Sequence, residues 1–526
     1  MKKIVIIGAG PAGLTTAYKL LKENNKYDIT IIEKSNIVGG ISTSITFDGY
    51  TIDTGIHRFF TKNDEVNQIW NDLLPIQGKL SYDDKILDRN LELSLNGPDP
   101  EKEDNVMLIK NRLTRIYYDN KFFNYPVSLN ADTLKKLGFI NVIKIGCSYL
   151  KSCIFKRKEE SLEDLYINKF GESLYQMFFE SYTEKVWGRH PSQISADWGN
   201  QRVKGISIKE VIKDFFRKKF NINNKNNTQT SLIESFYYPK KGSKQIWDLM
   251  ADYIINQGGK IIYSSEVVNI NFLKDKVRSV DYKNNGKIYN LKCDYLISSM
   301  PIKNLFEAFN GPVIPKKIYD SAINLPYREF MSVGLLVNKL NLNNDTNVKT
   351  INGIIPDNWI YVQDKRVKMG RLQVFNNWSP YLFKNKKDIN DKVLLTLEYF
   401  CSKDDEYWNM SDEDFIDFAI KDAEKINLFS KDDVISSTRI KIDKAYPGYF
   451  DSYSNIDKII NYLNKFDNLY CIGRNGQHRY NNMDHSMLTG LMTAKHIINP
   501  KSFKKSDIWN VNTEQEYHEV RNDKND

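Results

Sequence analysis

The sequence predicts an α/β protein built on a Rossmann-type dinucleotide-binding domain, with an inserted helical lobe and a second lobe around a mixed sheet. Three observations support this prediction. The chain opens with an apolar strand that turns through glycines into a helix. Residues from about 131 to 235 then place apolar side chains mostly at helical spacing. The apolar segment 293–301 and the segment that begins near residue 468 predict later strands that return the chain to the first domain. A chain of 526 residues also exceeds one compact core and should divide into two or three lobes.

The opening strand and helix enclose the motif G-x-G-x-x-G. Gly8 permits a tight turn, Gly10 lets the backbone approach a pyrophosphate, and Gly13 lets the helix pack on the strand. Glu33 follows twenty residues after Gly13, at the end of the second predicted strand, where its carboxylate can accept hydrogen bonds from the ribose of an adenosine. The motif alone is weak evidence, but the strand, helix and acid at the expected positions together predict a dinucleotide site.

A second glycine pair, Gly39 and Gly40, follows the acidic residue and leads into two short alternating strands that end near His57. This insertion resembles that of flavoproteins in the amine oxidase and UDP-galactopyranose mutase superfamily. In these proteins the glycine pair lies against the pyrophosphate and ribityl chain of FAD. The resemblance implies FAD rather than NAD as the cofactor and a nucleotide domain of the GR2 flavoprotein type. It also implies that the backbone of Val267 meets the adenine.

The predicted domains are discontinuous along the chain. The FAD-binding domain is expected from residues 1–75, 236–310 and 465–500, the helical lobe from 131–235, the substrate lobe from 76–130 and 311–464, and a polar tail from 501–526. Residues 117–128 predict a hairpin that turns at Asp119 and Asn120. Residues 221–230 are polar and predict a surface loop.

Composition narrows the class of protein. The formal charge is +9, but the lysines are dispersed and no nucleic-acid motif is present, so no nucleic-acid partner is expected. The five cysteines show no paired spacing, which predicts a reducing, cytoplasmic setting without a metal site. We expect no signal peptide, because the first predicted strand begins at Lys3, and we expect no stable membrane insertion. Residues 137–155 form the most apolar stretch, interrupted by Lys144 and Lys151, and predict an amphipathic helix packed on a lobe, with attachment to a membrane surface as an alternative.

Four segments, in order along the chain to about residue 498, resemble UDP-galactopyranose mutases, particularly the longer eukaryotic type. The first is GYTIDTGIHRFF, in which His57 takes the place of a histidine beside the isoalloxazine, although Ile56 replaces a glycine. The second is SYTEKVWGRHPSQISADWGNQRV, in which Arg202 takes the place of an arginine that binds the diphosphate of the sugar nucleotide.

The third segment is GRLQVFNNWSPY, in which Arg371 matches the second diphosphate arginine and Trp378 stands where a substrate-binding tyrosine is usual. Two arginines from separate segments suit this task, because guanidinium groups bind phosphates in a bidentate manner and stay charged when buried.

The fourth segment joins KAYPGY to GRNGQHRYNNMDHS. Tyr446 and Tyr480 match tyrosines that contact the diphosphate. The resemblance further assigns to the flavin the residues Gly473, Arg474, Asn482 and Asp484, the last two opening the final helix under the pyrimidine edge.

The resemblance implies a redox-neutral reaction that interconverts the pyranose and furanose forms of a UDP-sugar. N5 of the reduced flavin would attack the anomeric carbon, Arg202 and Arg371 would stabilise the departing UDP, and His57 would tune the flavin. Two alternatives stay open: an FAD-dependent oxidoreductase of the amine oxidase or protoporphyrinogen oxidase type, and a redox-inert binding protein. Ile41 favours the mutase over the oxidoreductase, because oxidoreductases of this superfamily commonly carry a basic residue after the glycine pair. The identity of the sugar and the oligomeric state stay open.

Overall fold

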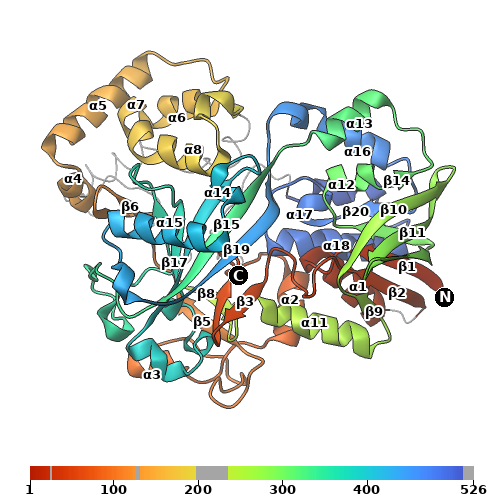
Figure 1. The fold of residues 1–526 in the computed structure, drawn as a ribbon, viewed down its shortest axis with the longest axis horizontal. Helices are drawn as coiled ribbons and strands as arrows, with labels where there is room; N and C mark the ends of the chain where they lie inside the picture. The colour runs from red at the N-terminus through yellow and green to blue at the C-terminus, as the bar shows by residue number, and fades with distance from the viewer. Residues whose placement is uncertain (24–25, 126–130, 197–234, 513–526) are drawn as a thin grey trace, which may run out of the picture.

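The computed structural model describes residues 1–23, 26–125, 131–196 and 235–512 (Figure 1). A five-stranded sheet and a seven-stranded sheet organise this part of the chain. In the described ranges no helix is both long enough and apolar enough to span a bilayer.

The five-stranded sheet is parallel throughout. Its strands, in spatial order, are β20 (Leu469–Cys471), β13 (Tyr295–Ser298), β1 (Lys2–Ile7), β2 (Tyr27–Ile32) and β9 (Lys260–Ile262). All five lie inside the ranges 1–75, 236–310 and 465–500. This parallel sheet is therefore assembled from three separated parts of the sequence.

Both faces of this sheet are buried, as is usual for parallel sheets. Ile4 and Ile6 of β1 face a layer of helices, whereas Val5 and Ile7 face the opposite layer. The first layer holds α1 (Pro11–Glu23), α11 (Lys244–Asn256), α18 (Met483–Ile498) and α2 (Asp64–Leu73). The second holds the sheet β12 (Lys287–Lys292), β11 (Lys276–Asn284), β10 (Ser265–Leu273) and β14 (Phe309–Asn310), with α12 (Ile302–Glu307), α13 (Lys316–Ile323) and α16 (Ile456–Leu463).

The seven-stranded sheet is mixed and forms the centre of the second lobe. Its strands, in spatial order, are β19 (Val434–Pro447), β15 (Tyr327–Val337), β18 (Val393–Cys401), β17 (Arg371–Val374), β16 (Trp359–Val362), β6 (Thr114–Tyr118) and β7 (Lys121–Asn124). Helix α15 (Asp412–Lys425) covers one apolar face of this sheet (Figure 1). The predicted hairpin is confirmed as β6 and β7, and the turn residues Asp119 and Asn120 both have positive φ angles, 49° and 57°.

Several short elements lie outside the large sheets. They are the hairpin β3 (Ser44–Phe47) and β4 (Tyr50–Asp53), the pair β5 (Met107–Asn111) and β8 (Ser235–Pro239), and the helices α3 (Tyr82–Ile86), α14 (Glu406–Asn409) and α17 (Gly473–Gly476). Ile52 of β4 lies against Gly334 of β15, where a Cβ atom would approach the isoleucine to 2.2 Å. This contact brings the segment that precedes His57 onto the second sheet.

The described part of the helical lobe lies at the edge of the molecule (Figure 1). It consists of α4 (Ala131–Leu137), α5 (Phe139–Ile154), α6 (Leu162–Phe170), α7 (Glu172–Tyr175), a π-helical turn over Gln176–Glu180 and α8 (Ser181–Trp187). Its core holds Phe170, Phe178 and Trp187. The rest of the predicted lobe, including the loop at 221–230, lies outside the described residues.

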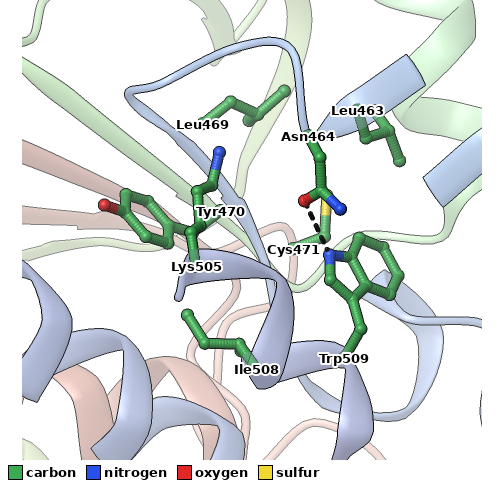
Figure 2. Close-up of a pocket in the computed structure, with 8 residues that line it drawn as sticks. All are labelled: Leu463, Asn464, Leu469, Tyr470, Cys471, Lys505, Ile508 and Trp509. Atoms are coloured by element: carbon green, nitrogen blue, oxygen red, sulfur yellow. Dashed lines mark hydrogen bonds between the residues drawn. The ribbon is translucent and has the colours of Figure 1, made fainter. Parts of the chain in front are cut away.

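The prediction of a polar tail over residues 501–526 is wrong for its first part, and residues 513–526 lie outside the described residues. Residues Lys505–Asn510 form a short 3₁₀ helix against the edge strand β20, and Ile508 and Trp509 are buried there (Figure 2). The indole nitrogen of Trp509 donates to Asn464 over 3.1 Å. A single Ile-Trp pair in a polar context anchors this segment, because two large apolar side chains lose water on packing.

Candidate active site

Two glycine loops meet at the carboxyl end of β1. The N–H of Gly39 donates to Ala9 over 2.9 Å, which ties the second loop to the first. A Cβ atom on Gly10 would lie 3.8 Å from the Cα of Gly40, and neither residue has a side chain to fill the space between the loops. This cradle at the start of α1 suits a pyrophosphate, because the free N–H groups of a helix N-terminus concentrate positive potential.

Glu33 closes the far side of this cradle. Its carboxylate accepts from the N–H of Ala9 over 2.6 Å and from both the N–H and hydroxyl of Ser35 over 2.8 Å. The carbonyl of Glu33 accepts from the N–H of Ser265 over 2.8 Å, so β10 and its residue Val267 begin beside this acid. Glu33 and Val267 therefore lie at the same end of the cradle.

Helix α18 begins at the other end of the site. Asn482 is its N-cap residue, in the predicted position. The Oδ1 atom of Asp484 is buried without a hydrogen-bond partner among the described residues, and Nδ1 of His485 lies 3.5 Å away. The carbonyl of Asn481 accepts from Nε of Arg474 over 2.9 Å, which holds the loop before the helix. An unsatisfied buried carboxylate oxygen fits a ligand that brings N–H or O–H donors, as a flavin ring does.

His57 lies between the two lobes. Burial, with the positive charges of Arg474 and Arg371, lowers the pKa of His57 to about 3. The Nε2 atom of His57 lies 3.4 Å from the hydroxyl of Thr54. The imidazole is therefore neutral at physiological pH, and two cations lie close enough to influence it.

Arg371 is held by a buried acid that the sequence analysis did not include. Its Nε donates to Glu398 over 2.5 Å, and the two residues are cross-strand neighbours on β17 and β18. A second donor of Arg371 reaches the hydroxyl of Tyr446 over 3.0 Å. Burial opposes the charge on Arg371, but the nearby Glu398 raises its pKa well above the ordinary value. Three of the five N–H donors of Arg371 have no partner within the described ranges, so they can bind an anion.

Two tyrosines and a second arginine complete the cluster. The rings of Tyr446 and Tyr480 stack with centroids 5.6 Å apart. The guanidinium of Arg474 lies 4.6 Å from the ring of Tyr480 and 5.7 Å from that of Tyr446. Asn512, in the C-terminal segment, donates to the carbonyl of Tyr480 over 3.0 Å and supports the loop from behind. The structure thus brings together four predicted residues, Arg371, Tyr446, Arg474 and Tyr480, close to His57.

The predicted substrate contact of Trp378 is wrong for this structure. The side chain is fully buried, packs edge-on against Phe236 and donates its indole N–H to the carbonyl of Asn358 over 3.0 Å. Trp378 therefore belongs to the core behind the second sheet, because strand β17 ends four residues earlier and the chain then turns away from the site. Arg202 lies outside the described residues, and its role stays a prediction.

Three further residues lie beside the cluster: Gln373, Tyr182 and Tyr361. Gln373 donates to Glu398 over 2.8 Å, and Tyr182 of α8 lies edge-on to Tyr361 of β16, with centroids 5.5 Å apart. Burial raises the pKa of Tyr182, which the charge of Arg371 opposes. A signal for part of this set exists in the sequence: polar residues alternate with apolar ones in RLQV and LLTLEYF, which is typical of strands with one polar face.

The carboxyl group of Asp53, four residues before His57, is buried and joins several segments by hydrogen bonds. It accepts from the hydroxyls of Ser44 over 2.7 Å and Tyr238 over 2.9 Å and from the N–H of Ser243 over 3.0 Å. Burial nevertheless raises its pKa from 3.8 to about 6. Between pH 3.8 and about pH 6, Asp53 is therefore protonated in the folded protein but ionised in the unfolded chain. The stabilisation from Asp53 is present in full below about pH 4 and is lost as the pH rises through about 6.

We expect Asp53→Asn to remove this pH dependence. Asn is isosteric, so its oxygen can accept from the two serine groups while its amide donates to Tyr238. Urea unfolding of both proteins from about pH 4 to about pH 7 should show the variant gaining about 2 kcal/mol relative to the wild type. A stability difference that stays constant over this range would contradict the assignment.

Comparisons with known proteins agree with this geometry. The model of the "Flavin containing amine oxidoreductase" family matches residues 11–444. A crystal structure of reduced UDP-galactopyranose mutase aligns over 98% of this chain and 100% of its own, with a TM-score of 0.73 and 20% identity. A putative protoporphyrinogen oxidase from Exiguobacterium sp. 255-15 aligns over 94% of this chain and 98% of its own, with a TM-score of 0.63 and 14% identity. These likenesses confirm the predicted fold class.

Similarity in sequence is weaker and more local. A probable UDP-galactopyranose mutase from Klebsiella pneumoniae is 26% identical over 202 residues, which are 37% of this chain and 43% of that protein. The matched part spans less than two thirds of the length of each curated relative compared.

Proposed function

Since the chain belongs to the family of flavin-containing amine oxidoreductases, we propose that it binds FAD and acts as a mutase of the UDP-galactopyranose mutase type. The substrate is a UDP-sugar, and the reaction exchanges the pyranose and furanose forms of the sugar without net oxidation. The observation that carries the proposal is the cluster of Arg371, Tyr446, Tyr480 and Arg474 around His57. The diphosphate of a nucleotide sugar needs such cations and phenol donors when it is buried, because its negative charge must be compensated.

The glycine cradle and Glu33 are the residues that would hold the diphosphate and adenosine of FAD, and Asp484 and Asn482 would face the ring system. A reduced flavin held by these residues would supply the nucleophile for the anomeric carbon. Arg371 binds the diphosphate with its remaining N–H donors and stabilises the negative charge of departing UDP. Tyr446 and Tyr480 orient the same group. Arg202 is proposed to complete this clamp.

His57 has a separate role in the proposal. Its imidazole stays neutral because its pKa is lowered to about 3, so it adds no charge beside the ring system. Its nitrogen atoms can still exchange hydrogen bonds with a neighbouring ring and the hydroxyl of Thr54. The reaction therefore relies on positioning and charge stabilisation rather than on an acid and base pair.

One observation favours a second candidate, an FAD-dependent oxidoreductase. Glu398 compensates the charge of Arg371, and the aromatic rings of Phe330 and Phe400 lie 5.9 Å and 4.9 Å from its guanidinium. Aromatic surroundings in which the charge of one arginine is compensated suit an apolar or amine substrate better than a diphosphate.

A mutase assay separates the two candidates. We expect dithionite-reduced protein under nitrogen to convert UDP-galactofuranose to UDP-galactopyranose, measured by anion-exchange chromatography, and unreduced protein to give no conversion. Conversion without reduction would contradict the proposed use of reduced flavin. Absence of conversion and of UDP binding, together with oxygen consumption on an amine or porphyrinogen, would favour the oxidoreductase.

A further inference from the structure

Helix α5 presents an apolar face to solvent. Six large apolar side chains on and beside this helix are 49 to 80% exposed: Phe139, Ile140, Ile143, Leu150, Ile154 and Phe155. The spacing of Phe139, Ile143, Leu150 and Ile154 places them along one side of the helix. Exposed patches of this kind mark interaction sites when they are contiguous.

The opposite side of α5 accounts for its packing in the lobe. Ile145 and Ser152 are buried there, and the helix contacts α6 and α7. Gly171, between α6 and α7, allows a close approach, because a Cβ atom on it would lie 2.8 Å from the backbone nitrogen of Tyr149. The helix is therefore held in place by one face, and the apolar stripe is not needed for that packing.

The charge around the stripe has one sign. Residues 133–158 include seven Lys or Arg and no Asp or Glu. Some of these cations are paired with acids outside the segment, as Lys136 is with Asp132 and Lys158 is with Glu160. In the part of the chain that the structure describes, Lys135, Lys144 and Lys151 form no ion pair. Lys144 and Lys151 lie on the helix itself. Lys144 directly follows Ile143 and Lys151 directly follows Leu150, so both lysines lie at the edge of the stripe.

We propose that α5 and its flanking basic residues form a docking surface for an anionic phospholipid membrane. The apolar stripe would enter the boundary between headgroups and acyl chains, while the lysines at its edge would contact lipid phosphates. A second copy of this chain is a poorer occupant, because two α5 helices would bring only like charges together. Figure 1 shows α5 at the outer edge of the helical lobe, away from the five-stranded sheet.

Vesicle sedimentation of the full chain tests this surface. We expect binding to phosphatidylcholine vesicles that contain roughly 30% phosphatidylglycerol, weaker binding to pure phosphatidylcholine, and loss of binding as salt is raised. Leu150→Glu should lower the partition constant roughly tenfold or more, since it places an acid in the stripe. Lys144→Gln with Lys151→Gln should lower it on the anionic vesicles and leave binding to neutral vesicles unchanged.

Leu95→Glu is the matched control, because Leu95 is fully exposed and lies outside the helical lobe. It should bind vesicles as the wild type does, and all variants should keep the flavin content of the wild type, which monitors folding. Absence of binding to anionic vesicles, or binding that Leu150→Glu does not change, would overturn the proposal. Light scattering that shows a dimer dissociated by Leu150→Glu would also overturn it and identify a second copy as the occupant.

Discussion

Replacing Arg371 by Ala is expected to abolish UDP binding and mutase turnover and also to destabilise the protein. The lost charged hydrogen bonds to a diphosphate are worth about 2 to 5 kcal/mol, which corresponds to a loss of about 30-fold or more in affinity. Titration calorimetry with UDP on the flavin-loaded protein measures this effect. Arg189→Ala is the control, because Arg189 forms an ion pair with Asp451 on the surface and should leave UDP affinity unchanged.

The loss of stability has a different cause. Glu398 is fully buried and depends on Arg371 for its charge partner. Removal of one member of a buried ion pair leaves an uncompensated charge and costs about 3 to 5 kcal/mol. A simple loss of activity in Arg371→Ala could therefore reflect poor folding rather than a missing ligand contact.

A double variant separates these causes. In Arg371→Ala with Glu398→Gln the orphaned charge is gone, and Gln373 can still bond to the new amide, so most of the unfolding free energy should return. UDP binding should stay lost. Glu398→Gln alone keeps the guanidinium and should retain UDP binding. A double variant that binds UDP as tightly as the wild type would remove Arg371 from the proposed clamp.

Gly13→Ala and Gly10→Ala are expected to fail in different ways. A Cβ atom on Gly13 would lie 2.0 Å from the carbonyl oxygen of Gly8, an overlap with backbone that the first turn of α1 cannot relieve. The cost should exceed the roughly 1 to 3 kcal/mol usual for an overpacked core. We expect little soluble Gly13→Ala protein.

Gly10→Ala should fold, because its Cβ atom would meet Gly40 at 3.8 Å, an ordinary contact, and Gly10 does not have a positive φ angle. The added methyl group would instead occupy the cradle proposed for the pyrophosphate. We expect unfolding of the flavin-free protein to match the wild type and retention of flavin, followed by visible absorbance, to fall roughly tenfold or more. Full flavin retention in Gly10→Ala would place the diphosphate elsewhere.

Much of the fold follows from local patterns in the chain. The motif at Gly8–Gly13 was recognisable because a tight turn and a close helix–strand contact each demand glycine at a set spacing. The hairpin at Asp119 and Asn120 was predictable because those residues tolerate positive φ. The helix at α5 was predictable from its periodicity, but the direction of its apolar face was not, because periodicity defines a face and not what lies against it.

The sequence by itself determined the Rossmann-type architecture, the cradle of glycines and four of the residues that converge near His57, since these depend on turn geometry and on ordered motifs. Only the tertiary structure decided which cations are compensated and which aromatic residues face the site. Arg371 and Glu398 are 27 residues apart in the chain and become partners only through the register of β17 and β18. Trp378 lies in the core for the same reason: strand pairing and the turn after β17 set the direction of a side chain, and neither is encoded in the motif around it.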